Sequence, residues 1–278
     1  MAAAACLVAL TGCGSSGGGL EGPKIGKAKS FAIAGFEPAG AVKPGVPTTV
    51  KFHITEPDGK TLTRFKTGGG PHTGVHLIFV RKDLSQIIHL HPPLQPDGSV
   101  SQQVTFPSAG PWHVLVDVYP DLGSNTLRNF QLTSDLTVTG AYKPVPLPAA
   151  GGAPQTVDGD HFVIKLPARI RSLRPQFFDV SVSDASGKPA TFGTWYGATA
   201  HAIFFREGSL DYFHTHVCRP EATVCTKSLA GSAVVGKSTK PGQLQVGTLL
   251  PTAGTWKLFL QTKVNGKVVT VPYTLKVA

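Results

Sequence analysis

The chain has 278 residues, a formal net charge of +10 at pH 7, 32 glycines and 23 prolines. This length allows two domains with cores of their own. Glycine and proline in such numbers are typical of short strands joined by turns, and the sequence shows no long apolar stripe of helical period. Lysines and arginines are scattered rather than interleaved with aromatic residues, which argues against a nucleic-acid partner.

The N-terminal segment has the features of an export signal. Residues 1–13 are apolar and end in Leu-Thr-Gly-Cys13, which a Gly/Ser-rich run follows. This resembles the lipobox of bacterial lipoproteins, in which the cysteine becomes the lipidated first residue. The leader is short and lacks Lys and Arg, so an ordinary apolar N-terminus is the alternative. We expect a signal peptide at 1–13, a flexible tether at 14–30, and an extracytoplasmic protein anchored to the membrane by lipid on Cys13.

The rest of the chain repeats one order of signals. Residues 52–60 and 180–188 each alternate like a strand and end in a Gly-Lys turn. Later, Pro-x-x-Gly turns lead into strands that carry Trp112 and Trp256. A Pro/Ala/Gly-rich linker at 141–155 separates the two copies. The sequence therefore predicts an all-β protein with two tandem immunoglobulin-like β-sandwich domains, at 31–140 and 156–278.

A histidine pattern occurs once in each copy. The second histidine follows the first by 13 residues, and the third lies two further on. We call these sets the first triad (His76, His89, His91) and the second triad (His201, His214, His216). Each spans a short polar turn and is typical of a β-hairpin. If Val80 pairs with Ile87, His76 lies opposite His91 and all three imidazoles of the first triad share the face opposite the core.

Three neutral imidazoles suit Cu(II) or Zn(II), with one coordination position left open. We therefore predict one metal site per domain. His72 is a candidate fourth ligand in the first domain, whereas the aligned residue in the second is Gly197. The sole methionine is Met1, which disfavours a soft Cu(I) site. The alternative is that the histidines only brace the hairpins through cross-strand contacts.

Cys218 and Cys225 lie in a segment that makes the second copy longer than the first by 19 residues. In an exported protein a local disulfide between them is expected. The alternative is that the thiols join His214 and His216 in a metal site.

The run at 74–92, together with 106–110, resembles a family of secreted bacterial proteins known mainly from actinobacteria and loosely labelled heavy-metal or copper associated. The second domain is similar at 195–201, 206–216 and 254–256. The resemblance covers most of both domains, but the family is largely uncharacterised, so it implies only a link to metals outside the cytoplasm. Val217 departs from the family, which usually has proline there, so the second site matches less well.

These observations predict a lipid-anchored protein that buffers, senses or delivers copper or zinc, with an envelope protein or metal acceptor as its partner. The alternative is a non-catalytic cell-envelope interaction module whose histidines are structural. We expect no enzyme, because Asp83 and Glu207 lie in the hairpin turns away from the histidines and no hydrolase motif is present. A metal-dependent hydrolase is the remaining alternative, since a three-histidine site with an open position can activate water.

Overall fold

The computed structural model describes residues 30–123, 129–222, 225 and 234–278, and these form mainly β-strands and turns. Cys13, the predicted lipidation site, and the rest of the leader and tether up to residue 29 lie outside the described residues. In the part of the chain that the structure describes, no helix is long and apolar enough to cross a membrane.

The first domain is a sandwich of two antiparallel sheets. Their strand orders are β1-β2-β5 and β4-β3-β6-β7. The strand bounds are β1 Ala32–Glu37, β2 Pro47–Thr55, β3 Val75–Arg81, β4 Ile87–Leu90, β5 Val100–Thr105, β6 Gly110–Val118 and β7 Phe130–Val138. Alternate residues of both sheets point inward and form one apolar core, which includes Phe52, Phe79 and Trp112. This is an immunoglobulin-like order with the fourth strand paired to the third.

The second domain repeats this topology. Strands β9-β10-β15 correspond to β1-β2-β5, and β13-β12-β16-β17 correspond to β4-β3-β6-β7. The bounds are β8 Gln155–Val157, β9 Asp160–Lys165, β10 Gln176–Ser183, β11 Phe192–Gly193, β12 Ala200–Arg206, β13 Tyr212–Cys218, β14 Gly236–Lys237, β15 Gln243–Thr248, β16 Gly254–Val264 and β17 Lys267–Val277. Strand β14 pairs with both β13 and β15, so it joins the two sheets along one side. The predicted pair of all-β sandwich domains is confirmed.

Each tryptophan lies at the equivalent place in its domain. Trp112 and Trp256 are both fully buried. Each donates its indole N–H to a carbonyl four residues earlier, Trp112 to Ser108 at 3.3 Å and Trp256 to Thr252 at 3.0 Å. The two Pro-x-x-Gly turns therefore serve the same purpose, which is to pack an indole into the core with its N–H satisfied.

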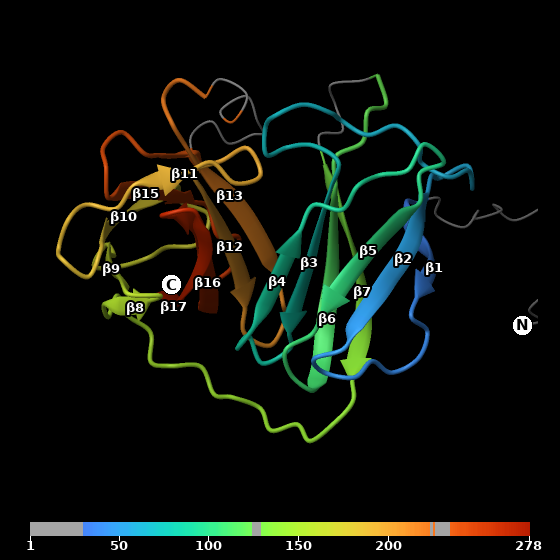
Figure 1. Cartoon of the computed structure of the whole chain (residues 1–278), viewed down its shortest axis with the longest axis horizontal. Helices are drawn as coiled ribbons and strands as arrows, with labels where there is room; N and C mark the ends of the chain where they lie inside the picture. Colours follow the sequence, from blue (N-terminus) through green and yellow to red (C-terminus); the bar gives the residue numbers. More distant parts are fainter. Residues whose placement is uncertain (1–29, 124–128, 223–224, 226–233) are drawn as a thin grey trace, which may run out of the picture.

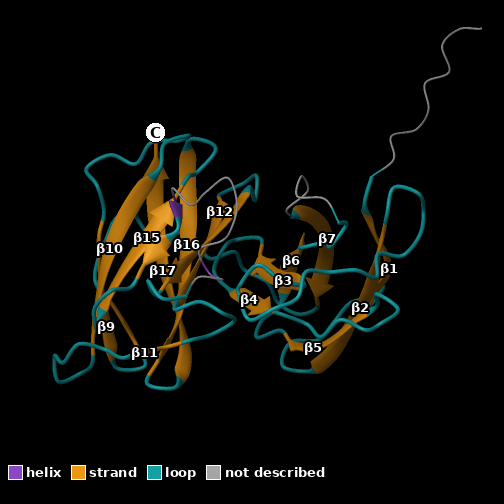
Figure 2. Ribbon diagram, turned by 90° about the horizontal axis from the view of Figure 1, so that it is seen from above, coloured by secondary structure: helices purple, strands orange, loops and turns teal. Residues whose placement is uncertain are grey.

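The two domains pack against each other through their hairpins. β3 and β4 of the first domain lie beside β12 and β13 of the second in the middle of the molecule (Figures 1 and 2). An apolar interface joins them and contains Ile78, Val80, Ile203, Phe205 and Phe259. Every residue of β3 is buried, because one face covers its own core and the other covers the partner domain.

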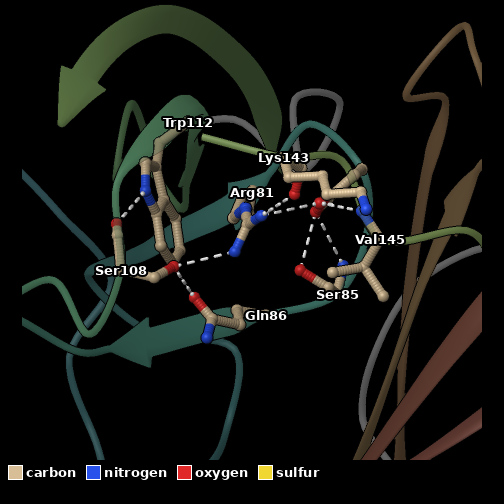
Figure 3. A network of polar contacts seen from close by, with 8 residues as sticks. Arg81, Ser85, Gln86, Ser108, Trp112, Lys143 and Val145 are labelled. Carbon is tan, nitrogen blue, oxygen red and sulfur yellow. Dashed lines mark hydrogen bonds and ion pairs between the residues drawn. The ribbon is translucent and has the colours of Figure 1, made fainter. Parts of the chain in front are cut away.

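The linker is fixed by a polar network at the end of β3, which Figure 3 shows. Arg81 forms an ion pair with Asp83 at 3.0 Å and donates to the Lys143 carbonyl at 3.0 Å. Asp83 in turn accepts a hydrogen bond from the Val145 amide at 2.9 Å, and Leu147 packs on the domain interface. The linker therefore helps to hold the domains in one arrangement.

The cysteines of the second domain form the predicted disulfide. Cys218, the last residue of β13, is bonded to Cys225 with a Cα–Cα distance of 5.8 Å. Both residues are buried. Cysteines in a disulfide have no free thiolate to bind a metal, which excludes the alternative of a Cys/His site.

Candidate metal centre

The first triad lies on the hairpin as predicted. Val80 pairs with Ile87 and Ile78 with His89. Continuing this register sets His76 opposite His91, just past the end of β4, and their ring centroids are 3.9 Å apart. Leu77 and Phe79, on the other face, belong to the core. Strand parity therefore placed the imidazoles correctly.

The second triad follows the same geometry. His201 pairs with His216 and Ile203 with His214 across β12 and β13. The ring centroids of His201 and His216 are 4.7 Å apart, and those of His214 and His216 are 4.4 Å apart. The hairpin therefore collects its three imidazoles on the face that meets the first domain.

The packing of the domains brings together the two triads that were predicted as separate sites. The first triad is still a group of three close nitrogens by itself, whereas the second forms such groups with His76 or His89 of the first. The two triads face each other across the interface and make a single group of six, which we call the histidine cluster. His76 lies 5.3 Å from His214, and His89 lies 5.2 Å from His201, between ring centroids. Strand parity determines which residues share a face, but it does not determine what that face packs against.

Three groups in the cluster have nitrogen atoms within 4.8 Å of one another, and two of these groups span both domains. The groups are His76–His89–His91, His76–His214–His216 and His89–His201–His214. Any two of them share one histidine. Two of these groups therefore cannot both be filled unless an imidazole bridges two ions.

Burial keeps the cluster neutral. Burial, together with the neighbouring His201, lowers the pKa of His91 to about 3, and burial lowers that of His201 to about 4. The other four lie well below their ordinary pKa, again mainly through burial (His76, His89, His214 and His216). At neutral pH each imidazole is therefore in the uncharged state that binds metals.

Several buried nitrogen atoms of these rings have no hydrogen-bond partner. These are both nitrogens of His76, Nδ1 of His214 and Nε2 of His216. Leaving a buried polar atom unpaired costs about 1–3 kcal/mol. The unpaired nitrogens belong to rings that face one another, so a single ion between the rings would satisfy several of them.

Two histidines are oriented from outside the cluster. His89 Nδ1 donates to Oε1 of Gln261 at 3.1 Å, and Gln261 donates its own amide to Thr270 Oγ1 at 3.0 Å. His201 Nε2 donates to the Trp195 carbonyl at 3.0 Å. Each bond fixes the ring proton on one nitrogen, so the other nitrogen is an acceptor inside the cluster. There His89 Nε2 accepts from His91 Nε2 and His201 Nδ1 accepts from His214 Nε2, both at 3.2 Å, and a metal would replace these bonds. Metal-binding histidines are usually held in this way.

Aromatic rings close one side of the cluster. Tyr196 stacks on His91 with centroids 3.9 Å apart, and Trp195 lies 5.0 Å from His201 and 5.5 Å from His89. These rings cover that side of the cluster and restrict the motion of the imidazoles they contact.

His72 reaches across to the second domain instead of joining the first triad. Its ring lies 4.6 Å from that of His216, and its buried Nδ1 has no partner. Burial lowers its pKa to about 4. The aligned Gly197 explains the asymmetry between the copies, because a Cβ there would lie 2.6 Å from the Gly69 carbonyl oxygen. Glycine therefore makes room for the loop that leads to His72.

One carboxylate near the cluster was not predicted from the sequence. Asp117 lies on β6 as the register partner of His76 and is 1% exposed. Burial raises its pKa to about 6, although the hydrogen bonds it accepts oppose that shift. An aspartate within the otherwise apolar run at 114–118 was the available signal, since charged residues are rarely buried without a purpose.

A pocket of about 310 Å³ opens beside the cluster at Asp117. Its lining residues come from both domains and include His72, Tyr119, Asn129, Gln131, Tyr212, His214, His216 and Leu249. The side of the cluster next to this pocket is thus hollow, whereas the side at Trp195 and Tyr196 is packed with aromatic rings.

Comparisons with known proteins identify the chain's family. A family model described as a domain of unknown function (DUF8832) matches residues 34–135 and 155–278. No curated protein matches the chain. Among solved structures, a Salmonella alpha-2-macroglobulin mutant aligns at 15% identity and a TM-score of 0.26, over 89% of this chain and 14% of that one.

Two further alignments are equally distant. Titin domains Z1Z2 in complex with telethonin align at 14% identity and a TM-score of 0.22, over 90% of this chain and 98% of that one. Invasin, a bacterial integrin-binding protein, aligns at 16% identity and a TM-score of 0.22, over 89% of this chain and 39% of that one. The chain spans about a seventh of the alpha-2-macroglobulin chain, and scores this low carry no argument about function. The two matched segments cover most of the sequence, and the chain belongs to the DUF8832 family.

Proposed function

We propose that this protein binds one divalent transition-metal ion, Cu(II) or Zn(II), in the histidine cluster between its two domains. The observation that carries the proposal is the set of buried, unpaired imidazole nitrogens that face one another. Burial lowers the pKa of these rings, so protonation does not compete with a metal near neutral pH. Imidazole ligands alone suit both ions.

The proposed role is binding rather than catalysis. Within the described residues, none of the six cluster histidines is hydrogen-bonded to a serine, a threonine or a carboxylate. A nucleophile–base pair of the kind used in acyl transfer is therefore not assembled around them. The role that we propose for the bound ion is therefore buffering, sensing or delivery of copper or zinc.

We further propose that the protein acts outside the cytoplasm and is anchored by lipid on Cys13. The disulfide between Cys218 and Cys225 supports this placement, because such bonds persist in oxidising compartments. The resemblance to a family of secreted bacterial proteins, loosely labelled heavy-metal or copper associated, supports the same placement. The partner would then be a membrane-associated metal acceptor or another envelope protein, with no role for nucleic acid.

The direct test is calorimetric titration of the metal-free protein with Zn(II) and with Cu(II). We expect one ion per chain with a dissociation constant below 1 μM, which corresponds to a binding free energy of at least about 8 kcal/mol in magnitude. The matched control replaces His53, His113 and His161, three of the four histidines outside the cluster, by alanine and should bind equally well. The proposal fails if the native protein shows no micromolar binding, or if the control variant loses it. Histidines that only brace the hairpins would give the first result.

A further inference from the structure

The pocket beside the histidine cluster contains a buried carboxylate, and within the described residues only neutral groups donate hydrogen bonds to it. Asp117 is buried, and the four groups that donate hydrogen bonds to it are neutral: Asn129, Gln131, Tyr119 and Tyr212. A buried carboxylate is costly unless a cation or strong donors compensate it. This arrangement therefore favours a cation in the pocket.

The two oxygens of Asp117 differ in how firmly they are held. Oδ1 accepts from Asn129 at 2.8 Å and from Gln131 at 3.1 Å. Among the described residues, Oδ2 accepts only from the hydroxyls of Tyr119 at 3.5 Å and Tyr212 at 3.4 Å, both at the outer limit for a hydrogen bond. One oxygen thus fixes the side chain, while the other is available to a ligand that binds it more strongly.

The same pocket leads to unpaired imidazole nitrogens. His72 Nδ1, His214 Nδ1 and His216 Nε2 are buried and lack partners, and all three residues line the pocket. Its volume of about 310 Å³ admits a hydrated ion, since one water occupies about 30 Å³. On the other side, Trp195 and Tyr196 cover the cluster.

From this geometry, and resting on the proposed metal binding, we propose that the pocket is the port through which a hydrated divalent cation enters and leaves the histidine cluster, with Asp117 Oδ2 as its first protein ligand. The net charge of +10 repels cations from the molecule as a whole. A local carboxylate at the port offsets that repulsion. The ion exchanges oxygen ligands, water and carboxylate, for imidazole nitrogens as it moves inward.

Stopped-flow mixing of the metal-free protein with Zn(II), read out with a chromophoric chelator, tests this proposal. Asp117→Asn should lower the association rate constant by about tenfold and weaken its dependence on ionic strength. Asp135→Asn is the matched control, because it removes the same charge from an exposed site on β7 and should leave the rate within about twofold of the native value.

A second variant tests the route itself. Leu249→Trp narrows the pocket without changing its charge or any cluster histidine. It should slow association and dissociation by the same factor and leave the dissociation constant within about twofold. Circular dichroism checks that each variant is folded, and if Asp117→Asn is not, Leu249→Trp decides.

Native association rates in both variants would overturn the proposal. So would a weaker equilibrium affinity in Asp117→Asn with an unchanged association rate, because that result would make Asp117 a counter-charge and not an entry ligand. Failure of the native protein to bind Zn(II) at equilibrium would instead contradict the proposed function.

Discussion

The overlap among the three histidine groups predicts a sharp difference between two double variants. His89→Ala with His214→Ala removes a ligand from every group, whereas His91→Ala with His216→Ala leaves His89–His201–His214 complete. Each pair takes one histidine from each domain, and each combines one buried with one half-buried ring. The two variants are therefore matched in chemistry and in packing loss.

The expected magnitude follows from the number of ligands. Structural zinc sites bind with about 10–16 kcal/mol through about four ligands, so one imidazole contributes about 3 kcal/mol, or roughly a hundredfold in the dissociation constant. The His89/His214 variant should lose at least that factor for Zn(II). The His91/His216 variant should stay within about tenfold of the native value, because a three-histidine group persists.

Titration calorimetry at pH 7.5 compares the two variants with the native protein. Equal losses in both would refute the sharing of ligands between groups. Retention of tight binding by the His89/His214 variant would refute the cluster as the binding site.

Three further results are expected. Gly197 has a φ of +77°, and a Cβ there would lie 2.6 Å from the Gly69 carbonyl oxygen. Gly197→Ala should therefore lower the free energy of unfolding, measured in urea, by about 2–4 kcal/mol and weaken metal binding. Native stability of this variant would contradict the close approach of the domains. Asp83→Asn leaves Arg81 without its ion-pair partner, so the melting temperature should fall while the Zn(II) dissociation constant stays unchanged. Burial lowers the pKa of the cluster histidines, so below about pH 6.5 the unfolded chain takes up protons that the folded chain does not. The free energy of unfolding of the metal-free protein should therefore fall as the pH drops toward 4, by about 1.4 kcal/mol per pH unit for each such proton. Asp117, whose pKa is raised to about 6, opposes this by one proton, and stability that rises on acidification would contradict the burial of the cluster.

The elements and the local geometry of the site were readable from the sequence. Hairpin register, the shared face of each triad, the two buried tryptophans and the Cys218–Cys225 bond all follow from spacing and strand parity. These features depend on residues close together in the chain or on the internal repeat, so the sequence pattern is enough to predict them.

The joining of the two triads was not predicted, although the sequence held a signal for it. Residues 77–80 and 202–205 are apolar at both parities, which indicates strands covered on both faces. A single sandwich covers only one face, so the second face required a partner, and the other hairpin supplies it through Ile78 and Ile203. The place of Asp117 beside the cluster and the contact of His72 with His216 depend on this packing of the two domains. Strand parity alone does not predict them.

The central claim is that both domains ligate one ion. A crystal structure of the Zn(II)- or Cu(II)-loaded protein, with the ion located by its anomalous scattering, tests it most directly. We expect one ion within about 2.0–2.1 Å of imidazole nitrogens from each domain, drawn from the histidine cluster. An ion held by histidines of one domain alone, or at His53, His113 or His161, would contradict it.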